Sequence, residues 1–112
     1  MTEDGVDSAI RRAIGGDTAA ISWILTHADT TDDALVIALA ALLERQPERL
    51  RRADTVAATT RDRQVVAIAR ARLAGQSELV DALARDHLAD HPANLLVAWI
   101  AADALDRPRR TG

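Results

Sequence analysis

The sequence predicts an all-α protein of about seven short helices, packed as antiparallel hairpins. The first indication is the set of apolar residues, because these make up 48% of the 112 residues while aromatic residues make up only 2%. Without Phe, Tyr or Cys, the core has to consist of Ala, Leu, Ile and Val, and small side chains favour helices that approach one another closely. Second, no run of useful length shows the period-two alternation of a strand. Third, Gly, Pro and capping residues interrupt the chain at short intervals.

Seven segments carry the helical pattern, and residues that begin or end helices separate them. The predicted helices cover residues 6–14, 18–27, 33–45, 48–58, 62–74, 78–91 and 94–105. Near the amino terminus, Gly15-Gly16 offers a left-handed residue that ends the first helix, and Asp17 is placed to cap the second. Pro47 ends the third helix and opens the fourth.

Similar residues divide the second half of the chain. A pair of threonines, residues 59–60, breaks the chain and caps the fifth helix. Gly75 ends that helix, and Ser77 is expected to cap the sixth. Pro92 then terminates the sixth helix, because the residue before a proline disfavours helical geometry.

The distribution of apolar residues predicts which helices lie in the middle. The segment ALVIALAALL, residues 34–43, is apolar all the way round, so the third helix should be buried. Trp23 of the second helix is expected to be a structural residue of the core. Connections of about two to six residues should place neighbouring helices antiparallel. We expect one domain over residues 1–106 and a flexible Arg-rich tail over residues 107–112.

Composition and charge narrow the classes of function. The net charge of -3 at pH 7 argues against nucleic acid, which prefers a basic surface. The absence of Cys excludes disulfides and thiol catalysis. All the basic residues are Arg, which together with abundant Ala indicates a GC-rich bacterial genome. The acidic start and the shortness of every apolar run predict a cytoplasmic protein that makes no membrane contact.

Residues 61–94 form a unit of 34 residues that reads as a helix, a turn at Gly75, a second helix and a stop at Pro92. This length, with a turn residue between the two helices and a proline after the second, resembles a tetratricopeptide repeat. The wider segment 59–102 is most similar to bacterial relatives of the tetratricopeptide repeat protein 38 family, in which an RDR-like start, a central AG and an HLADHP-like end recur. Residues 32–58 resemble a degenerate preceding repeat. The resemblance implies an α-α superhelix and contact with other proteins, and it implies no enzymatic activity.

His87 and His91 are the candidate metal ligands. Their spacing places both on one side of a helix, with Asp86 and Asp90 beside them, and two imidazoles with a carboxylate suit a transition metal. The pair lies in the last turn, however, where histidine also suits the helix dipole and the last carbonyl groups. We therefore predict no metal and no cofactor, and keep His87 and His91 as the alternative site.

Arginine and hydroxyl residues give weaker candidates. Arg49, Arg51 and Arg52, together with the Arg-rich tail, can contact phosphates, but acidic neighbours favour a solvated surface and no aromatic residues are interleaved to stack bases. The glycine pair at residues 15–16 lacks the spacing of a phosphate loop. No nucleophile elbow or glycine-rich catalytic site is present, so we predict that the protein is not an enzyme.

The seventh predicted helix carries the interface prediction. Its sequence, NLLVAWIAADAL, is apolar on several sides, whereas one neighbouring helix covers only one stripe. The stacking order is expected to place the first helices at the opposite end of the molecule. Because exposed apolar faces mark interfaces, we expect Leu96, Trp99 and Ile100 at the interface of a two-fold homodimer.

Two functional interpretations follow from these patterns. The first is a non-enzymatic protein–protein interaction or self-association module whose partner is unknown. The alternative is a small ligand- or metal-binding regulatory protein that uses the helix end with His87 and His91. A stable dimer without ligand favours the first interpretation, and a tightly retained metal favours the second.

Overall fold

The computed structural model describes the backbone of residues 3–106 and the side chains of residues 5–102, and the described backbone forms seven helices. No strand occurs within this range, so the predicted all-α class is confirmed. The predicted tail, residues 107–112, lies outside the described residues. In chain order the helices are α1 (Glu3–Ile14), α2 (Thr18–His27), α3 (Ala34–Glu44), α4 (Arg49–Val56), α5 (Thr60–Leu73), α6 (Ser77–Asp90) and α7 (Leu95–Asp106).

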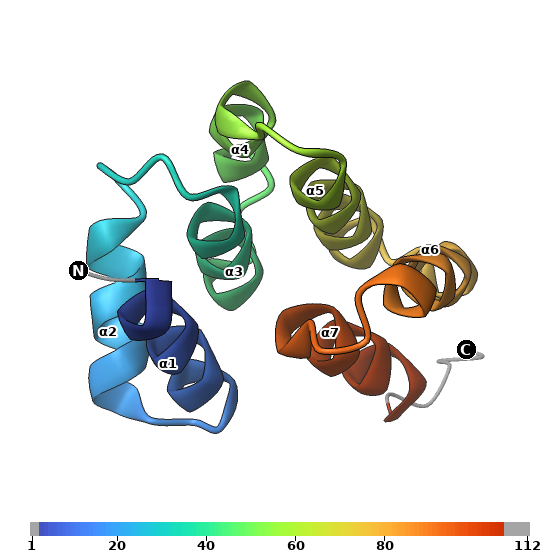
Figure 1. The fold of residues 1–112 in the computed structure, drawn as a ribbon, viewed down its shortest axis with the longest axis horizontal. Coiled ribbons are helices and arrows are strands. Elements are labelled where there is room, and N and C mark those ends of the chain that lie inside the picture. The colour runs from blue at the N-terminus through green and yellow to red at the C-terminus, as the bar shows by residue number, and fades with distance from the viewer. Residues whose placement is uncertain (1–2, 107–112) are drawn as a thin grey trace.

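The helices alternate between the inside and the outside of the molecule. α1, α3, α5 and α7 surround the centre, whereas α2, α4 and α6 lie on the periphery (Figure 1). Each peripheral helix packs on the inner helix that precedes it in sequence, and α7 packs on both α5 and α6. The series also curves back on itself, because α1 contacts α7. None of the described helices is long and apolar enough to cross a membrane.

Most of the predicted helix caps are present. Asp17 Oδ1 accepts hydrogen bonds from the backbone N–H groups of Ala19 and Ala20, at 2.9 and 3.2 Å. Thr59 Oγ1 accepts one from the N–H of Asp62 at the start of α5, at 3.0 Å. These bonds satisfy donors that a helix leaves without partners at its amino-terminal end.

The predicted cap at Ser77 is wrong. Ser77 is the first residue inside α6, Gln76 occupies the cap position, and no side chain caps this end. The reason is the tightness of the turn. The Gln76 N–H closes the preceding helix on the Ala71 carbonyl at 3.0 Å, and the Gln76 carbonyl already accepts the N–H of Val80 at 2.9 Å.

Three inner helices end in a residue with left-handed backbone geometry. After α1 this residue is Gly16, with φ of 94°, and after α5 it is Gly75, with φ of 74°. Glycine is the usual residue there because it lacks the Cβ that disfavours positive φ. After α3 the residue is Arg45, with φ of 53°, the one non-glycine residue with positive φ in the described part of the chain.

The core is centred on α3, as the sequence predicts. Ala34 and every residue from Val36 to Ala41 are buried, and α1, α2, α4 and α5 all pack against this helix. Ala at several of these positions lets the neighbouring helices approach closely. Trp23 is half-buried and packs against the core, as expected of a structural residue, and its indole stacks on the His27 ring with centroids 4.5 Å apart.

The exposed apolar surface predicted for α7 is largely absent. Leu96 and Ile100 are each 1% exposed, and Val97 is fully buried. The prediction was wrong because it placed α1 at the far end of the stack. In the structure α1 reaches α7 and, with α5 and α6, surrounds it, and the first and last helices lie next to each other at the lower edge of the ring in Figure 1.

Candidate functional site

His87 connects the last three helices. It lies in the last turn of α6 and is 1% exposed. Its Nδ1 atom lies 2.7 Å from Oε1 of Gln64 on α5, and its Nε2 atom lies 2.9 Å from Nδ2 of Asn94. Because an amide oxygen accepts and an amide nitrogen donates, these contacts select a neutral ring that carries its proton on Nδ1.

This arrangement leaves neither ring nitrogen of His87 available to a metal. The ring of His91 is a neighbour, with a centroid distance of 4.8 Å, but a shared ion would have to displace Gln64 or Asn94 from His87. Within the described residues, no group of three or more His, Cys, Asp or Glu side chains is placed to hold a metal ion. His87 therefore serves the packing of α5, α6 and α7 in this structure, and His91 lies beside its ring.

The environment of His87 lowers the pKa of its imidazole. Burial is the largest cause, and the positive charges of His91 and Arg61 lower the pKa further, whereas the carboxylate of Asp90 opposes the shift. The neutral form required by the two hydrogen bonds is thus the form that the surroundings favour. Asn94 also accepts a hydrogen bond from the Val97 N–H on Oδ1, at 3.3 Å, and thereby caps α7.

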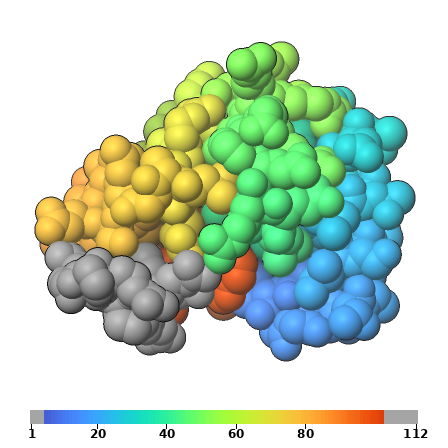
Figure 2. All heavy atoms as spheres, turned by 180° about the vertical axis from the view of Figure 1, so that it is seen from behind, coloured from blue at the N-terminus to red at the C-terminus, as the bar shows by residue number. Residues whose placement is uncertain are grey.

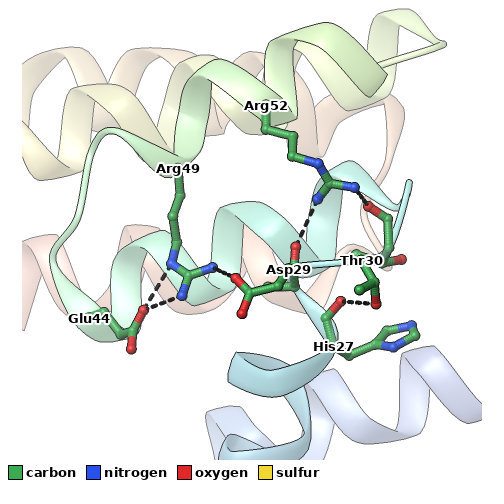
Figure 3. A network of polar contacts seen from close by, with 8 residues as sticks. His27, Asp29, Thr30, Glu44, Arg49 and Arg52 are labelled. Carbon is green, nitrogen blue, oxygen red and sulfur yellow. Dashed lines mark hydrogen bonds and ion pairs between the residues drawn. The ribbon is translucent and has the colours of Figure 1, made fainter.

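Two of the candidate phosphate-binding arginines are occupied by the fold. Arg49 pairs with Glu44 at 2.7 Å and with Asp29 at 3.1 Å. Arg52 donates to the backbone carbonyls of Ala28 and Thr31. Figure 3 shows both guanidinium groups reaching from α4 to the turn that joins α2 to α3. These arginines fasten α4 over that turn, so they are not free to contact a phosphate backbone.

A recess lies where the ends of two inner helices meet the middle of a third. It forms between the carboxyl-terminal end of α3, the carboxyl-terminal end of α5 and α7, and has a volume of about 480 Å³. This volume is within the range of small-ligand sites. Figure 2 shows this side of the molecule, with the orange-red surface of α7 visible beside the green segment that follows α3. The residues that line the recess are Leu42, Leu43, Arg45, Pro47, Arg72, Leu73, Gly75, Trp99 and Ile100.

The recess combines apolar side chains with positive charge. Its lining contains three leucines and the Trp99 indole, and its two charged residues are Arg45 and Arg72. Among the residues that the structure describes, no carboxylate belongs to this lining set. Glu44 is adjacent to Arg45 in sequence, but its carboxylate is held by Arg49. The recess therefore presents an apolar surface next to the positive charge of Arg45.

Arg45 is the residue of the recess with the least favourable local geometry. Its left-handed φ of 53° follows from its position after α3, where the Gln46 N–H bonds to the Ala41 carbonyl at 2.9 Å. A side chain at such a position costs about 1 kcal/mol relative to glycine. Backbone strain of this kind clusters at functional sites, which draws attention to the Arg45 side chain.

The structure brings together only part of the predicted site. Trp99 and Ile100, predicted as interface residues, line the recess, while Leu96 lies in the core. Sequence reasoning missed Arg45, Arg72 and the leucines that complete the recess. One feature of the sequence could have indicated Arg45. Glycine residues follow α1 and α5, whereas an arginine occupies the corresponding place after α3.

Comparison of the chain with protein-family models, curated proteins and solved structures found no match. The resemblance to tetratricopeptide repeats therefore stays a prediction.

Proposed function

We propose that this protein is a non-enzymatic module that binds another protein, and that the recess between α3, α5 and α7 is its contact site. The observation that carries the proposal is the joint presence of Trp99, an unpaired Arg45 guanidinium and an apolar lining in one surface hollow. Aromatic residues and arginine are the types that dominate binding energy at protein interfaces. Within the described residues, no hydrogen bond or ion pair engages the Arg45 side chain.

The scaffold that we propose is a superhelix similar to tetratricopeptide repeats. The inner and outer alternation of helices supports this, as does the hairpin of α5 and α6, which spans most of the 34-residue unit. Stacked hairpins of this kind present surfaces for protein contact without a dedicated chemistry. The recess fits a binding role better than a catalytic one, because the described part of its lining includes no histidine, carboxylate, serine or threonine that would move a proton or attack a substrate.

A homodimer through α7 does not form part of this proposal. Leu96 and Ile100 are covered within one chain, so an interface that uses them would have to displace α1 or α5. Trp99 is half-buried in the recess, and it is the one residue of the predicted interface that a partner can reach without such a rearrangement.

The proposal is tested by comparing the proteins that tagged variants retain from extracts of the producing cells. Arg45→Gln removes the charge of the recess, and Arg63→Gln is the matched control, because Arg63 is an exposed arginine in the first turn of α5, at the opposite end from the recess. We expect quantitative mass spectrometry to find a partner that the wild type and Arg63→Gln retain and that Arg45→Gln loses. A set of retained proteins that is the same for all three would contradict the proposed site.

A further inference from the structure

We infer that the recess recognises an acidic segment that carries an apolar anchor: one aspartate or glutamate carboxylate pairs with Arg45 while a neighbouring apolar side chain occupies the surface formed by Trp99 and the leucines. This inference rests on the proposed function and specifies the chemistry of the partner. It follows from complementarity, because no described residue pairs with the Arg45 guanidinium and the apolar side chains beside it are only partly buried.

The charge of the recess indicates a carboxylate. A guanidinium group forms paired hydrogen bonds with a carboxylate that are stronger than neutral ones. The nearest acidic residue in sequence, Glu44, does not supply this partner, since Arg49 approaches its carboxylate with two nitrogens, at 2.7 and 2.8 Å. Arg49 also pairs with Asp29. The ion pairs among Glu44, Arg49 and Asp29 therefore do not include Arg45.

The apolar lining indicates that the charge is accompanied by an aliphatic or aromatic side chain. Leu42, Leu43 and Leu73 are each only partly buried, as is Trp99, although all four pack against the core. An apolar group that covers them would remove surface from water, which is favourable. A volume of about 480 Å³ admits one or two such side chains and is too small for a folded element.

The backbone at Arg45 supports the same inference. Glycine would fit the left-handed position without strain, as Gly16 and Gly75 do at the equivalent ends of α1 and α5. Arginine at this position is explained if its side chain has a task that glycine cannot perform. The three leucines and Trp99 do not have positive φ. The unfavourable backbone geometry therefore distinguishes Arg45 from the apolar side chains of the recess.

The test uses three synthetic peptides with blocked ends. The first is acetyl-Gly-Glu-Leu-Leu-Asp-Gly-amide, the second replaces its acidic residues by Gln and Asn, and the third replaces its two leucines by serine. Binding is followed by NMR on the ¹⁵N-labelled full chain, whose only two indole N–H signals come from Trp23 and Trp99. A Trp23→Phe variant assigns the signals, and Trp23 on α2 then serves as an internal reference outside the recess.

We expect the first peptide to shift the Trp99 signal at millimolar concentration and to leave the Trp23 signal in place. The uncharged and the serine peptides should each bind at least about threefold more weakly, and Arg45→Gln should weaken the first peptide by about threefold to tenfold. Arg63→Gln should have no effect, and added salt should weaken binding.

Three outcomes would overturn the inference: no shift of Trp99 up to about 10 mM peptide, equal shifts of both indoles, or equal binding of the charged and uncharged peptides. The inference and the proposed function fail separately. A partner retained in an Arg45-dependent way, combined with peptides that do not bind or do not discriminate, refutes the chemistry and preserves the function. The absence of such a partner refutes the function whatever the peptides do.

Discussion

At the scale of single residues, His87 shows how one buried polar side chain sets the orientation of its neighbours. Both ring nitrogens are used, one by Gln64 and one by Asn94. Protonation would place a second N–H opposite the Asn94 amide nitrogen, which is itself a donor. If the Asn94 side chain turned its oxygen towards the ring, it would break the hydrogen bond that this oxygen accepts from the Val97 N–H. A charge on His87 therefore conflicts with the cap of α7.

We predict that this conflict makes folding stability depend on the proton occupancy of His87. The pKa is lowered in the folded state from its ordinary value of 6.5, so the unfolded chain binds more protons than the folded one between the two values. The stabilising contribution is complete above the unfolded pKa and is lost as the pH falls through 6.5 towards the folded pKa.

Urea unfolding between about pH 7 and pH 5 measures this effect. The free energy of unfolding should fall more steeply for the wild type than for His87→Gln, in which an amide that does not titrate replaces the buried imidazole. His27→Gln, which alters a histidine outside this contact network, is the control, and its slope should exceed that of His87→Gln. Parallel slopes for the wild type and His87→Gln would contradict the role assigned to His87.

The left-handed residues give a second prediction at this scale. Arg45→Gly should stabilise the protein by about 0.5–1 kcal/mol, because it relieves a side chain held at positive φ. Gly75→Ala should destabilise by about 1 kcal/mol for the same reason. An added Cβ at Gly75 meets no heavy atom within 4 Å, so the loss reports backbone conformation alone. Chemical denaturation measures both, and a stability loss in Arg45→Gly would show that its φ is not strained.

Some of these residue roles were readable in the sequence and others were not. Asp17 and Thr59 were identifiable as caps because a cap acts on the backbone two or three residues away. The partners of His87 lie 23 and 7 residues away, and no local pattern indicates such a contact. Arg45 was overlooked because the sequence shows which residue follows a helix but not the φ that it adopts.

At the scale of helices, α4 is held in place by its polar contacts as well as by its core residues Leu50 and Ala53. Arg52 donates to the carbonyls of Ala28 and Thr31 and so joins α4 to the preceding turn. We predict that Arg52→Ala costs about 1 kcal/mol, because it leaves both carbonyl groups without this donor. Arg51→Ala on the exposed side of α4 should cost less than about 0.5 kcal/mol. Equal losses in thermal unfolding would show that the contacts contribute no net stability.

The burial of α7 gives the prediction that differs most from the sequence-based expectation. Ile100→Asp places an unpaired charge in the core and should cost about 4 kcal/mol or more. Ala102→Asp on the exposed side of the same helix should change the free energy by less than about 0.5 kcal/mol. Denaturation at neutral pH compares the two variants. If the wild type proved to be a dimer and Ile100→Asp a stable monomer, Ile100 would belong to a dimer interface and not to the core.

Helix positions followed from the sequence more readily than helix environments. The apolar periodicity and the Gly and Pro punctuation placed all seven helices close to their observed bounds, and the unbroken apolar run of α3 correctly indicated its central burial. The surroundings of α7 did not follow. The several apolar stripes of α7 need several neighbouring helices to cover them. No local pattern in the sequence indicates that α1 packs against α7 and covers one of these stripes.

At the scale of the whole molecule, curvature explains both the buried core and the recess. Because the inner helices close into a ring that brings α1 to α7, apolar stripes on α7 are covered without a second chain. The ends of α3 and α5 do not extend over the middle of α7, and the recess is formed there. The chain as a whole carries a net charge of -3, so it repels acidic peptides at long range. Binding of such a peptide would therefore report the local charge of the recess.

We propose that Arg45 lowers the stability of the fold and serves binding instead. Thermal unfolding of the wild type and of Arg45→Gly, each with and without the acidic leucine peptide, tests it directly, because a ligand that binds the folded state raises its stability. We predict that Arg45→Gly unfolds at a higher temperature than the wild type when both are free. The peptide should raise the unfolding temperature of the wild type more than that of Arg45→Gly. An equal rise in both proteins, or a free Arg45→Gly that is less stable than the wild type, would contradict the account.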